Sequence, residues 1–372
     1  MANHITHDPI YNTVDRDDFL SLIEVERYAD RADAFDSIIA ATVDHFWDPG
    51  DPRYIDYEAG DFDMANQTVL PPEMVVELQS AVADRLDEGQ KIRLANENAR
   101  FMLSSILHGE QGALSLSASL CHILRDPGAQ EYAANQTREE ARHVHAFARY
   151  IEKRFGSPLA AGPTLANLMV EVVHAPEVYK KLVGMQMLIE GLAMGAFATL
   201  HMRSQDPLLR RLVQLVMTDE AFHHKFGKIW ADKTIPKLGE AEHERVETWA
   251  AECFQTLLFN LVNSEQKQAI YGEFGLDWQW VRSAVLEAFT DKDRRQNMTE
   301  GTNIFRVLIK TLLKAGIITE RTRPVYAQWV DMDELSREDD EVAGSEVAEA
   351  GIEELREINR SRQRLGRGLR SA

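Results

Sequence analysis

Hydrophobic residues recur at intervals of three and four positions over most of the chain, and alternating runs of hydrophobic and polar residues are almost absent. A period near 3.6 residues is that of an amphipathic helix, whereas a half-buried strand has a period of two. The pattern therefore predicts an all-α protein. Long helical patterns fill residues from about 90 to 232, and they break at 125–130, 156–164 and 204–209, where Pro and Gly gather.

Shorter helical patterns flank this central region on both sides. The predicted flanking helices cover 26–47, 71–86, 241–262, 276–290 and 302–315. We expect residues 1–330 to form one helical domain. Beyond it, residues 331–355 are strongly acidic and 356–371 are strongly basic. Blocks of like charge are usually solvated or disordered. We therefore expect residues 331–372 to form a charged, flexible tail.

Length and composition exclude several classes of protein. The 372 residues, 44% hydrophobic and 27% charged, are enough to bury a sizeable core. The formal net charge of −19 argues against nucleic acid or an anionic membrane as a partner, because phosphate binding needs a basic patch. Only Cys121 and Cys253 are present, so neither a disulfide framework nor a CxxC metal site is expected.

The same features predict a location in the cell. Few cysteines are typical of a reducing cytoplasm. The N-terminal residues lack the basic and apolar regions of a secretory signal, and we expect no run of apolar residues long enough to span a membrane. The sequence therefore predicts a cytoplasmic protein.

Two copies of the sequence Glu-x-x-His in the central region lie eighty residues apart. A further glutamate stands thirty residues before each copy. One copy and its preceding glutamate therefore repeat the other at a constant offset. The six residues of this duplicated pattern are Glu110, Glu140, His143, Glu190, Glu220 and His223.

An Asp-Pro step separates the glutamate from the motif in each half, at Asp126-Pro127 and at Asp206-Pro207. Asp is a good N-cap and Pro suits the first helical position, so each half predicts two antiparallel helices joined by a tight turn. The first glutamate lies 17 residues before the proline and the second lies 13 after it. At a rise of about 1.5 Å per residue these are roughly 25 and 20 Å from the turn, so the carboxylates come level across the hairpin.

Two such hairpins, packed as a four-helix bundle, would bring four carboxylates and two imidazoles to one level. Residues i and i+3 share a helix face, so each Glu-x-x-His can bind one ion. Buried carboxylates without compensation are costly, and two divalent cations would remove that cost. One Glu from each of two helices, with Glu-x-x-His from each of the other two, is the pattern of di-iron and di-manganese carboxylate bundles. A third Glu-x-x-His, Glu171 with His174, has no such glutamate before it, and we expect it to be unrelated.

At these residues the chain resembles the ferritin-like di-iron carboxylate superfamily, over about residues 90–232. The stretches "GE" at 109–110, "EEARH" at 139–143 and "TDEAFH" at 218–223 are most similar to its oxygen-activating branch. That branch holds the bacterial multicomponent monooxygenase hydroxylases, the ribonucleotide reductase small subunits and the arylamine N-oxygenases. The resemblance implies a ferritin-like four-helix bundle with additional N- and C-terminal helices. It also implies that the six residues named above bind two Fe, with Mn as an alternative.

In the monooxygenases an acidic residue directly precedes each Glu-x-x-His and hydrogen-bonds the histidine of the opposite motif. Here Glu139 and Asp219 hold these positions. The resemblance implies that both orient an imidazole and that Arg142 braces them. For Glu139 an exposed position on the helix remains an alternative, because residue i−1 points away from its neighbouring ligand.

Each close relative lacks one diagnostic residue in this chain. Phe147 stands where ribonucleotide reductase small subunits usually carry a radical tyrosine, and Val216 stands where arylamine N-oxygenases add a third histidine. Met194 stands where the hydroxylases often have a threonine. We therefore expect a different branch. Tyr150, two turns past the first motif, is either an electron relay or a core tyrosine.

These features predict a non-haem di-iron oxygenase or oxidase, which uses O₂ and external electrons to oxidise a small organic substrate. Hydroxylation, N-oxygenation and desaturation-type chemistry all remain open. One alternative is a ribonucleotide-reductase-like or Mn/Fe oxidase protein, and another is a non-enzymatic iron-handling protein. A reductase or ferredoxin as electron donor and a homodimer are also expected. A set of small and soft residues either leaves room beside Glu190 or packs tightly against another helix: Gly191, Ala193, Met194, Gly195 and Ala196.

Overall fold

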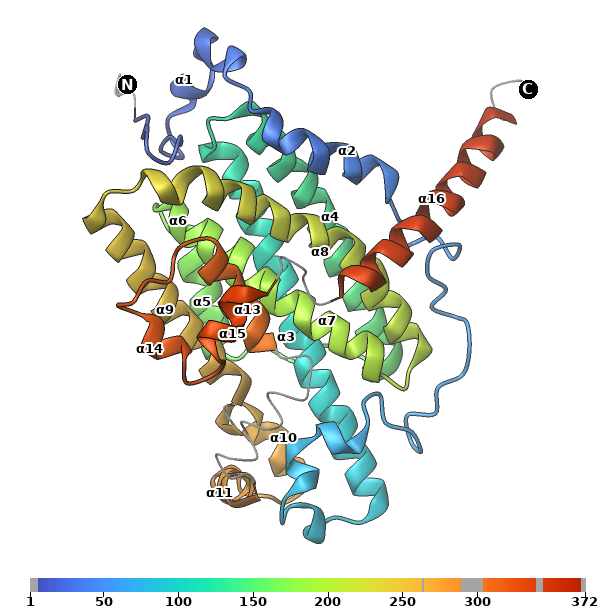
Figure 1. Ribbon diagram of the computed structural model, residues 1–372. Coiled ribbons are helices and arrows are strands. Elements are labelled where there is room, and N and C mark those ends of the chain that lie inside the picture. The colour runs from blue at the N-terminus through green and yellow to red at the C-terminus, as the bar shows by residue number, and fades with distance from the viewer. Residues whose placement is uncertain (1–5, 263, 289–303, 339–343, 369–372) are drawn as a thin grey trace.

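The computed structural model describes residues 6–262, 264–288, 304–338 and 344–368. Within these ranges the protein is built from helices (Figure 1). No strand forms in the described ranges, where the β contacts are isolated bridges from Asp8 to Thr13 and from Thr13 to Leu124. The prediction of an all-α protein is confirmed.

Four long helical segments form the centre of the protein. In chain order they are α3 (Glu88–Ile123), α4 (Pro127–Phe155), α7 (Glu190–Arg203) and α8 (Pro207–Thr234). Helix α3 packs along α4, and α7 packs along α8. Helix α8 also contacts α4, so the two hairpins meet.

Both turns between paired helices form as the Asp-Pro steps predict. Oδ1 of Asp126 accepts hydrogen bonds from the backbone N–H of Gly128 at 2.8 Å and of Ala129 at 3.2 Å. Oδ1 of Asp206 accepts one from the backbone N–H of Leu208 at 2.9 Å. Each cap satisfies N–H groups that have no partner inside the helix and contributes about 1 kcal/mol.

A π-helix leads into α7 and brings the chain close to α8. It spans Leu182–Ile189 (η6) and follows the short helix α6 (Val178–Lys181). It packs against Gly227, where an added Cβ would lie 2.9 Å from Cβ of Gln186. Only a residue without a side chain allows this approach. Single π-turns are often found at functional sites.

Three of the five flanking helices lie where the sequence predicts them. They are α9 (Glu240–Val262), α11 (Trp278–Ala288) and α13 (Ile304–Lys314). Residues 289–290 and 302–303 of the predicted ranges lie outside the described residues. Helix α5 (Pro163–His174) and the short α10 (Gln268–Glu273) and α14 (Arg323–Tyr326) complete this part.

Of the other two predicted flanking helices, the one over 71–86 is wrong and the one over 26–47 is confirmed only over Asp36–Asp44. Residues 71–86 form three short 3₁₀ turns, and residues 26–47 form two 3₁₀ turns followed by α2 (Asp36–Asp44). Tertiary contacts outweigh the helical pattern in both segments. In 71–86, for example, the carboxylate of Glu77 is buried and accepts hydrogen bonds from Lys267 and Tyr271.

The charged C-terminal segment, expected to be a flexible tail, is helical over much of its described part. It contains α15 (Met332–Arg337) and α16 (Ser345–Gly368), whereas residues 339–343 and 369–372 lie outside the described residues. Helix α16 packs on α8 and buries Ala348, Ile352 and Leu355. Its C-terminal end extends away from the other helices (Figure 1).

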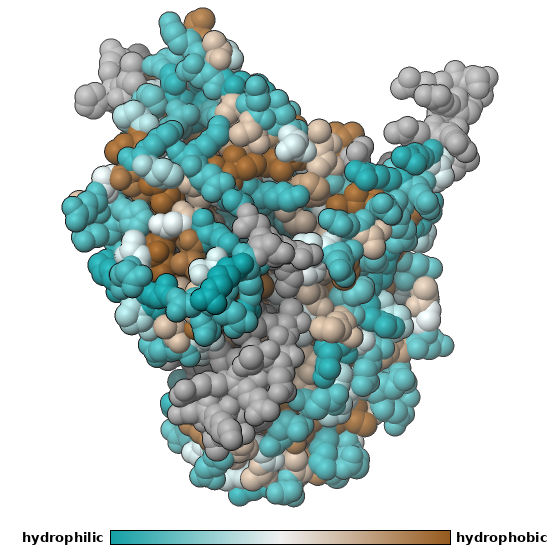
Figure 2. Space-filling view, viewed as in Figure 1, coloured by the Kyte–Doolittle hydropathy of each residue, from teal (hydrophilic) through white to brown (hydrophobic). Residues whose placement is uncertain are grey.

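Among the described residues, one helical stretch is long and apolar enough to cross a membrane, contrary to the sequence expectation. It runs from Val178 to Arg203, through α6, η6 and α7. Within the protein, however, 72% of its most apolar window is buried, and it carries the buried carboxylate of Glu190. These two features identify a core helix. Figure 2 shows that hydrophilic residues dominate the face of the molecule in view.

Candidate metal centre

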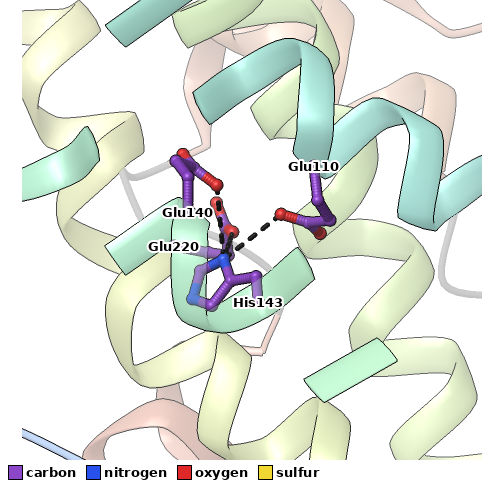
Figure 3. Close-up of side chains that lie close together, drawn as sticks. All are labelled: Glu110, Glu140, His143 and Glu220. Carbon is purple, nitrogen blue, oxygen red and sulfur yellow. Dashed lines mark hydrogen bonds and ion pairs between the residues drawn. The ribbon is translucent and has the colours of Figure 1, made fainter. Parts of the chain in front are cut away.

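The six side chains of the duplicated motif meet in the interior, between the four long helices (Figure 3 shows four of them). All six are at most 5% exposed. Their oxygen and nitrogen atoms fall into two overlapping groups, and within each group the atoms lie within 4.8 Å of one another. One group is Glu110, Glu140, His143 and Glu220, and the other is Glu140, Glu190, Glu220 and His223.

Glu140 and Glu220 belong to both groups. Nδ1 of His143 lies 3.3 Å from Oε2 of Glu140 and 3.1 Å from Oε1 of Glu220. Nδ1 of His223 lies 3.1 Å from the other oxygen of each carboxylate. Each of these two carboxylates therefore presents one oxygen to each histidine. Carboxylates placed in this way are suited to bridge two cations.

The negative charge of the cluster favours the binding of such cations. Together with Glu139 and Asp219, six carboxylates are buried here, and the guanidinium of Arg142 neutralises one of the six charges. Oε2 of Glu140 and Oε1 of Glu220 accept no hydrogen bond from the described residues, although both lie beside Nδ1 of His143. Unpaired buried charges cost several kcal/mol each. Two divalent cations would compensate four of the five remaining charges, and carboxylate with imidazole suits Fe or Mn.

When no metal is bound, protons neutralise part of the negative charge of the cluster. Burial raises the pKa of Glu110 to about 8 and that of Glu190 well above its usual value. Burial alone would lower the pKa of His143 and His223, but the surrounding carboxylates raise both well above the ordinary value. Metal ions bind deprotonated carboxylates and neutral imidazoles, so metal binding must release protons.

Glu139 and Asp219 each contact the histidine of the opposite motif. Oδ2 of Asp219 lies 2.8 Å from Nε2 of His143, and Oε2 of Glu139 lies 3.0 Å from Nε2 of His223. Both carboxylates are buried, so the exposed alternative for Glu139 is wrong. An acceptor at Nε2 places the ring proton there and leaves the lone pair of Nδ1 directed at the carboxylate cluster.

Arg142 ties the two motifs together. Its Nη2 and Nε donate to the two oxygens of Asp219 at 2.7 and 3.1 Å, and its Nη2 lies 3.4 Å from Oε1 of Glu139. A guanidinium that binds both oxygens of a carboxylate forms a strong and directional pair. Arg142 therefore fixes α4 to α8 beside the cluster.

Two further residues, which the sequence did not predict, contact the carboxylates of Asp219 and Glu139. Nε1 of Trp47 donates to Oδ2 of Asp219 at 2.8 Å, and the indole stacks on His143 with ring centroids 6.0 Å apart. Nε2 of His45 lies 3.2 Å from Oδ1 of Asp219 and 3.7 Å from Oε1 of Glu139. Both side chains are fully buried. They precede the first motif by more than ninety residues, so no local spacing signals their position.

Other candidates from the sequence lie away from the cluster. The hydroxyl of Tyr150 donates to Oδ2 of Asp206 at 2.8 Å, which makes Tyr150 a core residue that supports the second turn. Glu171 of the third Glu-x-x-His accepts a hydrogen bond from Trp249. An added Cβ at Gly191 would lie 3.1 Å from Leu308, so this position of α7 packs tightly against α13.

The pKa of His45 predicts a pH-dependent stability for the metal-free protein. Burial lowers the pKa of this imidazole, but the carboxylates of Asp219 and Glu139 outweigh burial and raise it from 6.5 to about 9. The resulting stabilisation is fully present below about pH 6.5 and is lost as the pH rises through about 9. It amounts to at most about 3 kcal/mol. We expect the Tm of the metal-free protein to fall between pH 7 and 10, and less so in His45→Gln.

The matched control for this measurement is His145→Gln, because His145 is exposed on α4. This variant should show the pH dependence of the wild type in thermal melts. If His45→Gln and the wild type lose stability equally over the same pH range, the assignment of a charged His45 is wrong.

Comparison with known protein families gives no match for this chain, and comparison with curated proteins gives none either. The fold class and the kind of site are therefore taken from the structure. The chain is an all-α protein with a buried cluster of carboxylates and histidines that is compatible with a di-iron site.

Proposed function

We propose that this protein is a non-haem di-iron oxygenase or oxidase that oxidises a small organic substrate with O₂. The observation that carries the proposal is the pair of overlapping ligand groups that share Glu140 and Glu220. Two adjacent redox-active ions, when bound, supply the two-electron chemistry with O₂ that amino-acid side chains cannot perform. The electrons would come from a reductase or ferredoxin.

The protein's own residues hold, orient and shield this centre. Glu110 and His143 would hold one ion, Glu190 and His223 the other, and Glu140 and Glu220 both. The near-complete burial of these side chains excludes bulk water, which strengthens every charge interaction inside. The carboxylates behind the two imidazoles set their orientation and raise their basicity.

One observation favours an oxygenase or oxidase over a radical-storing protein of the ribonucleotide reductase type. Phe147 fills the position of the radical tyrosine, is fully buried, and stacks on Phe197 with ring centroids 5.7 Å apart. A phenylalanine cannot give a phenoxyl radical. An iron-storage role is less suited to a closed set of six ligands that two ions would satisfy.

Loading the protein with Fe(II) without O₂ is expected to give about two iron ions per chain. The reduced, loaded protein should then consume O₂, and an oxygen electrode measures the uptake. Chelation should lower the Tm, because free metal at 100 times its Kd adds about 2.7 kcal/mol to stability. Emission spectrometry measures the metal content, and calorimetry measures the Tm.

The same measurements separate the alternatives. A mixture of Mn and Fe, or a stable radical signal after exposure to O₂, would favour the Mn/Fe oxidase or reductase-like protein. Stable binding of many iron ions per chain would favour iron handling. Less than one ion per chain under saturating Fe(II) would contradict the metal centre itself.

A further inference from the structure

Two buried glutamines lie beside Glu190, and neither belongs to the predicted ligands. Gln136 stands four residues before Glu140 on α4, and Gln186 stands four residues before Glu190 in η6. Both are fully buried. Nε2 of Gln136 lies 3.0 Å from Oε1 of Glu140, 3.4 Å from Oε1 of Glu190 and 3.2 Å from Oε1 of Gln186. One amide group therefore joins a carboxylate of each hairpin.

The two carboxylates decide which way these amides face. An ionised carboxylate only accepts hydrogen bonds, so the NH₂ group of Gln136 must face Glu140 and, once metal binding has removed its proton, Glu190. The same NH₂ group also reaches the carbonyl oxygen of Gln186. Two N–H bonds are thus shared among three acceptors. Any rotation of the Glu190 carboxylate changes how they are shared.

The remaining atoms of the pair argue against a purely structural role. Oε1 of Gln136 and Nε2 of Gln186 have no hydrogen-bond partner among the described residues. A buried donor or acceptor without a partner costs about 1–3 kcal/mol, whereas an apolar side chain of similar size fills the same volume without that cost. The backbone of Gln186 also packs directly against Gly227, because Gly227 has no side chain to keep the two segments apart. The contacts that the two amides make, rather than the volume they fill, therefore account for glutamine at both positions.

We propose that Gln136 is a positioning residue that ties Glu190 to Glu140 across the two hairpins, and that Gln186 holds the amide of Gln136 in place. The inference rests on the proposed dinuclear centre. Loss of the amide lets the Glu190 carboxylate turn, so the ion that it shares with His223 is bound less tightly. The amide also contacts Glu140, which belongs to both groups, but it does so at Oε1, the oxygen that faces His223. An ion held by Glu110 and His143 should therefore be affected much less.

Titration with Co²⁺ tests the proposal without O₂ or substrate, because the visible absorption of Co²⁺ reports its coordination. The wild type should bind about two Co²⁺ ions per chain. Gln136→Met keeps the length of the side chain but removes the amide. It should weaken one of the two ions by about 10–100-fold and change the absorption of that ion alone. Gln186→Met should shift both readouts in the same direction, by less.

Gln111→Met is the matched control, because Gln111 is exposed next to Glu110 on α3. It should reproduce the wild-type affinities and spectrum. A folded Gln136→Met protein with both affinities and the spectrum unchanged would overturn the proposal. If Gln136→Met does not fold, Gln136→Asn takes its place: the same weakening supports the proposal and wild-type values overturn it.

The failure of this inference is distinguishable from that of the proposed function. A wild-type protein that binds fewer than two Co²⁺ ions refutes the dinuclear centre and the role of Gln136 with it. A wild type that binds two, beside a Gln136→Met protein that is unchanged, refutes only the role of Gln136.

Discussion

Glu220→Gln is expected to abolish the binding of both metal ions. Glu220 belongs to both ligand groups and faces Nδ1 of His143 and of His223 with its two oxygens, each at 3.1 Å. Gln keeps the size of the side chain but has no charge, and only its neutral carbonyl oxygen could still bind a metal ion. The affinity for each ion should fall by more than about 100-fold. Loss of a residue that only supports a metal ligand from behind costs about 10–100-fold, and loss of the ligand itself should cost more. Calorimetry with Co²⁺ and the iron content after Fe(II) loading measure the loss.

Three further variants make this result specific. Glu110→Gln and Glu190→Gln each remove a carboxylate that belongs to one group only, so each should lose one ion and keep the other. Glu171→Gln alters the unrelated Glu-x-x-His and should bind two ions like the wild type. If Glu220→Gln still binds two ions, or loses only one, Glu220 does not bridge the centre.

Arg142→Met is expected to cause the largest loss of stability, about 3–5 kcal/mol in the metal-free protein. The variant leaves the carboxylates of Asp219 and Glu139 buried without the guanidinium that contacts both. Met fills a similar volume, so the loss comes from charge rather than from a cavity. Chemical denaturation monitored by circular dichroism measures the free energy of unfolding.

The control for this variant is Arg138→Met, because Arg138 is exposed on the same helix, above the ring of Phe46. Exposed substitutions of this kind change the free energy of unfolding by less than about 1 kcal/mol. Equal destabilisation by the two variants would show that Arg142 contributes through general packing or helix propensity. The buried pair with Asp219 would then not account for its effect.

With all six buried carboxylates deprotonated, the charges of the region would balance only if metal ions were bound. Six carboxylates, one guanidinium and two divalent cations would leave one negative charge. A protonated His45, in contact with Asp219 and Glu139, would remove it. The segment that carries His45 and Trp47 therefore contributes to the centre, although it lies outside the four long helices.

Sequence spacing was sufficient to find the buried cluster of carboxylates and histidines because helix period, capping and rise are local properties of the chain. Glu140 and His143 share a helix face through the period of the α-helix, and a cap such as Asp126 marks where the chain turns. The distances from the turn then bring Glu110 level with Glu140. A helix has a fixed rise per residue, so counting along the chain measures depth in the hairpin.

Gln136 was within reach of the same reasoning, and its partner was not. Gln136 lies one turn before Glu140 on the same face, which the sequence shows. The closeness of Gln186 depends on a π-helix and on the packing of Gly227 against it, and neither leaves a pattern in the hydrophobic positions. The short turns over 71–86 were missed for a similar reason, because the partners of Glu77 come from residues nearly 200 positions later.

The sequence by itself determined the helical class, the two capped hairpins and the six side chains that face one another, because helix period, rise and capping are properties of neighbouring residues. Only the tertiary structure decided that His45 and Trp47 reach Asp219, that α16 covers α8, and that Gln136 joins the two hairpins. These contacts join segments far apart in the chain. Their free energy comes from burial and charge pairing in the folded state, which no local pattern records.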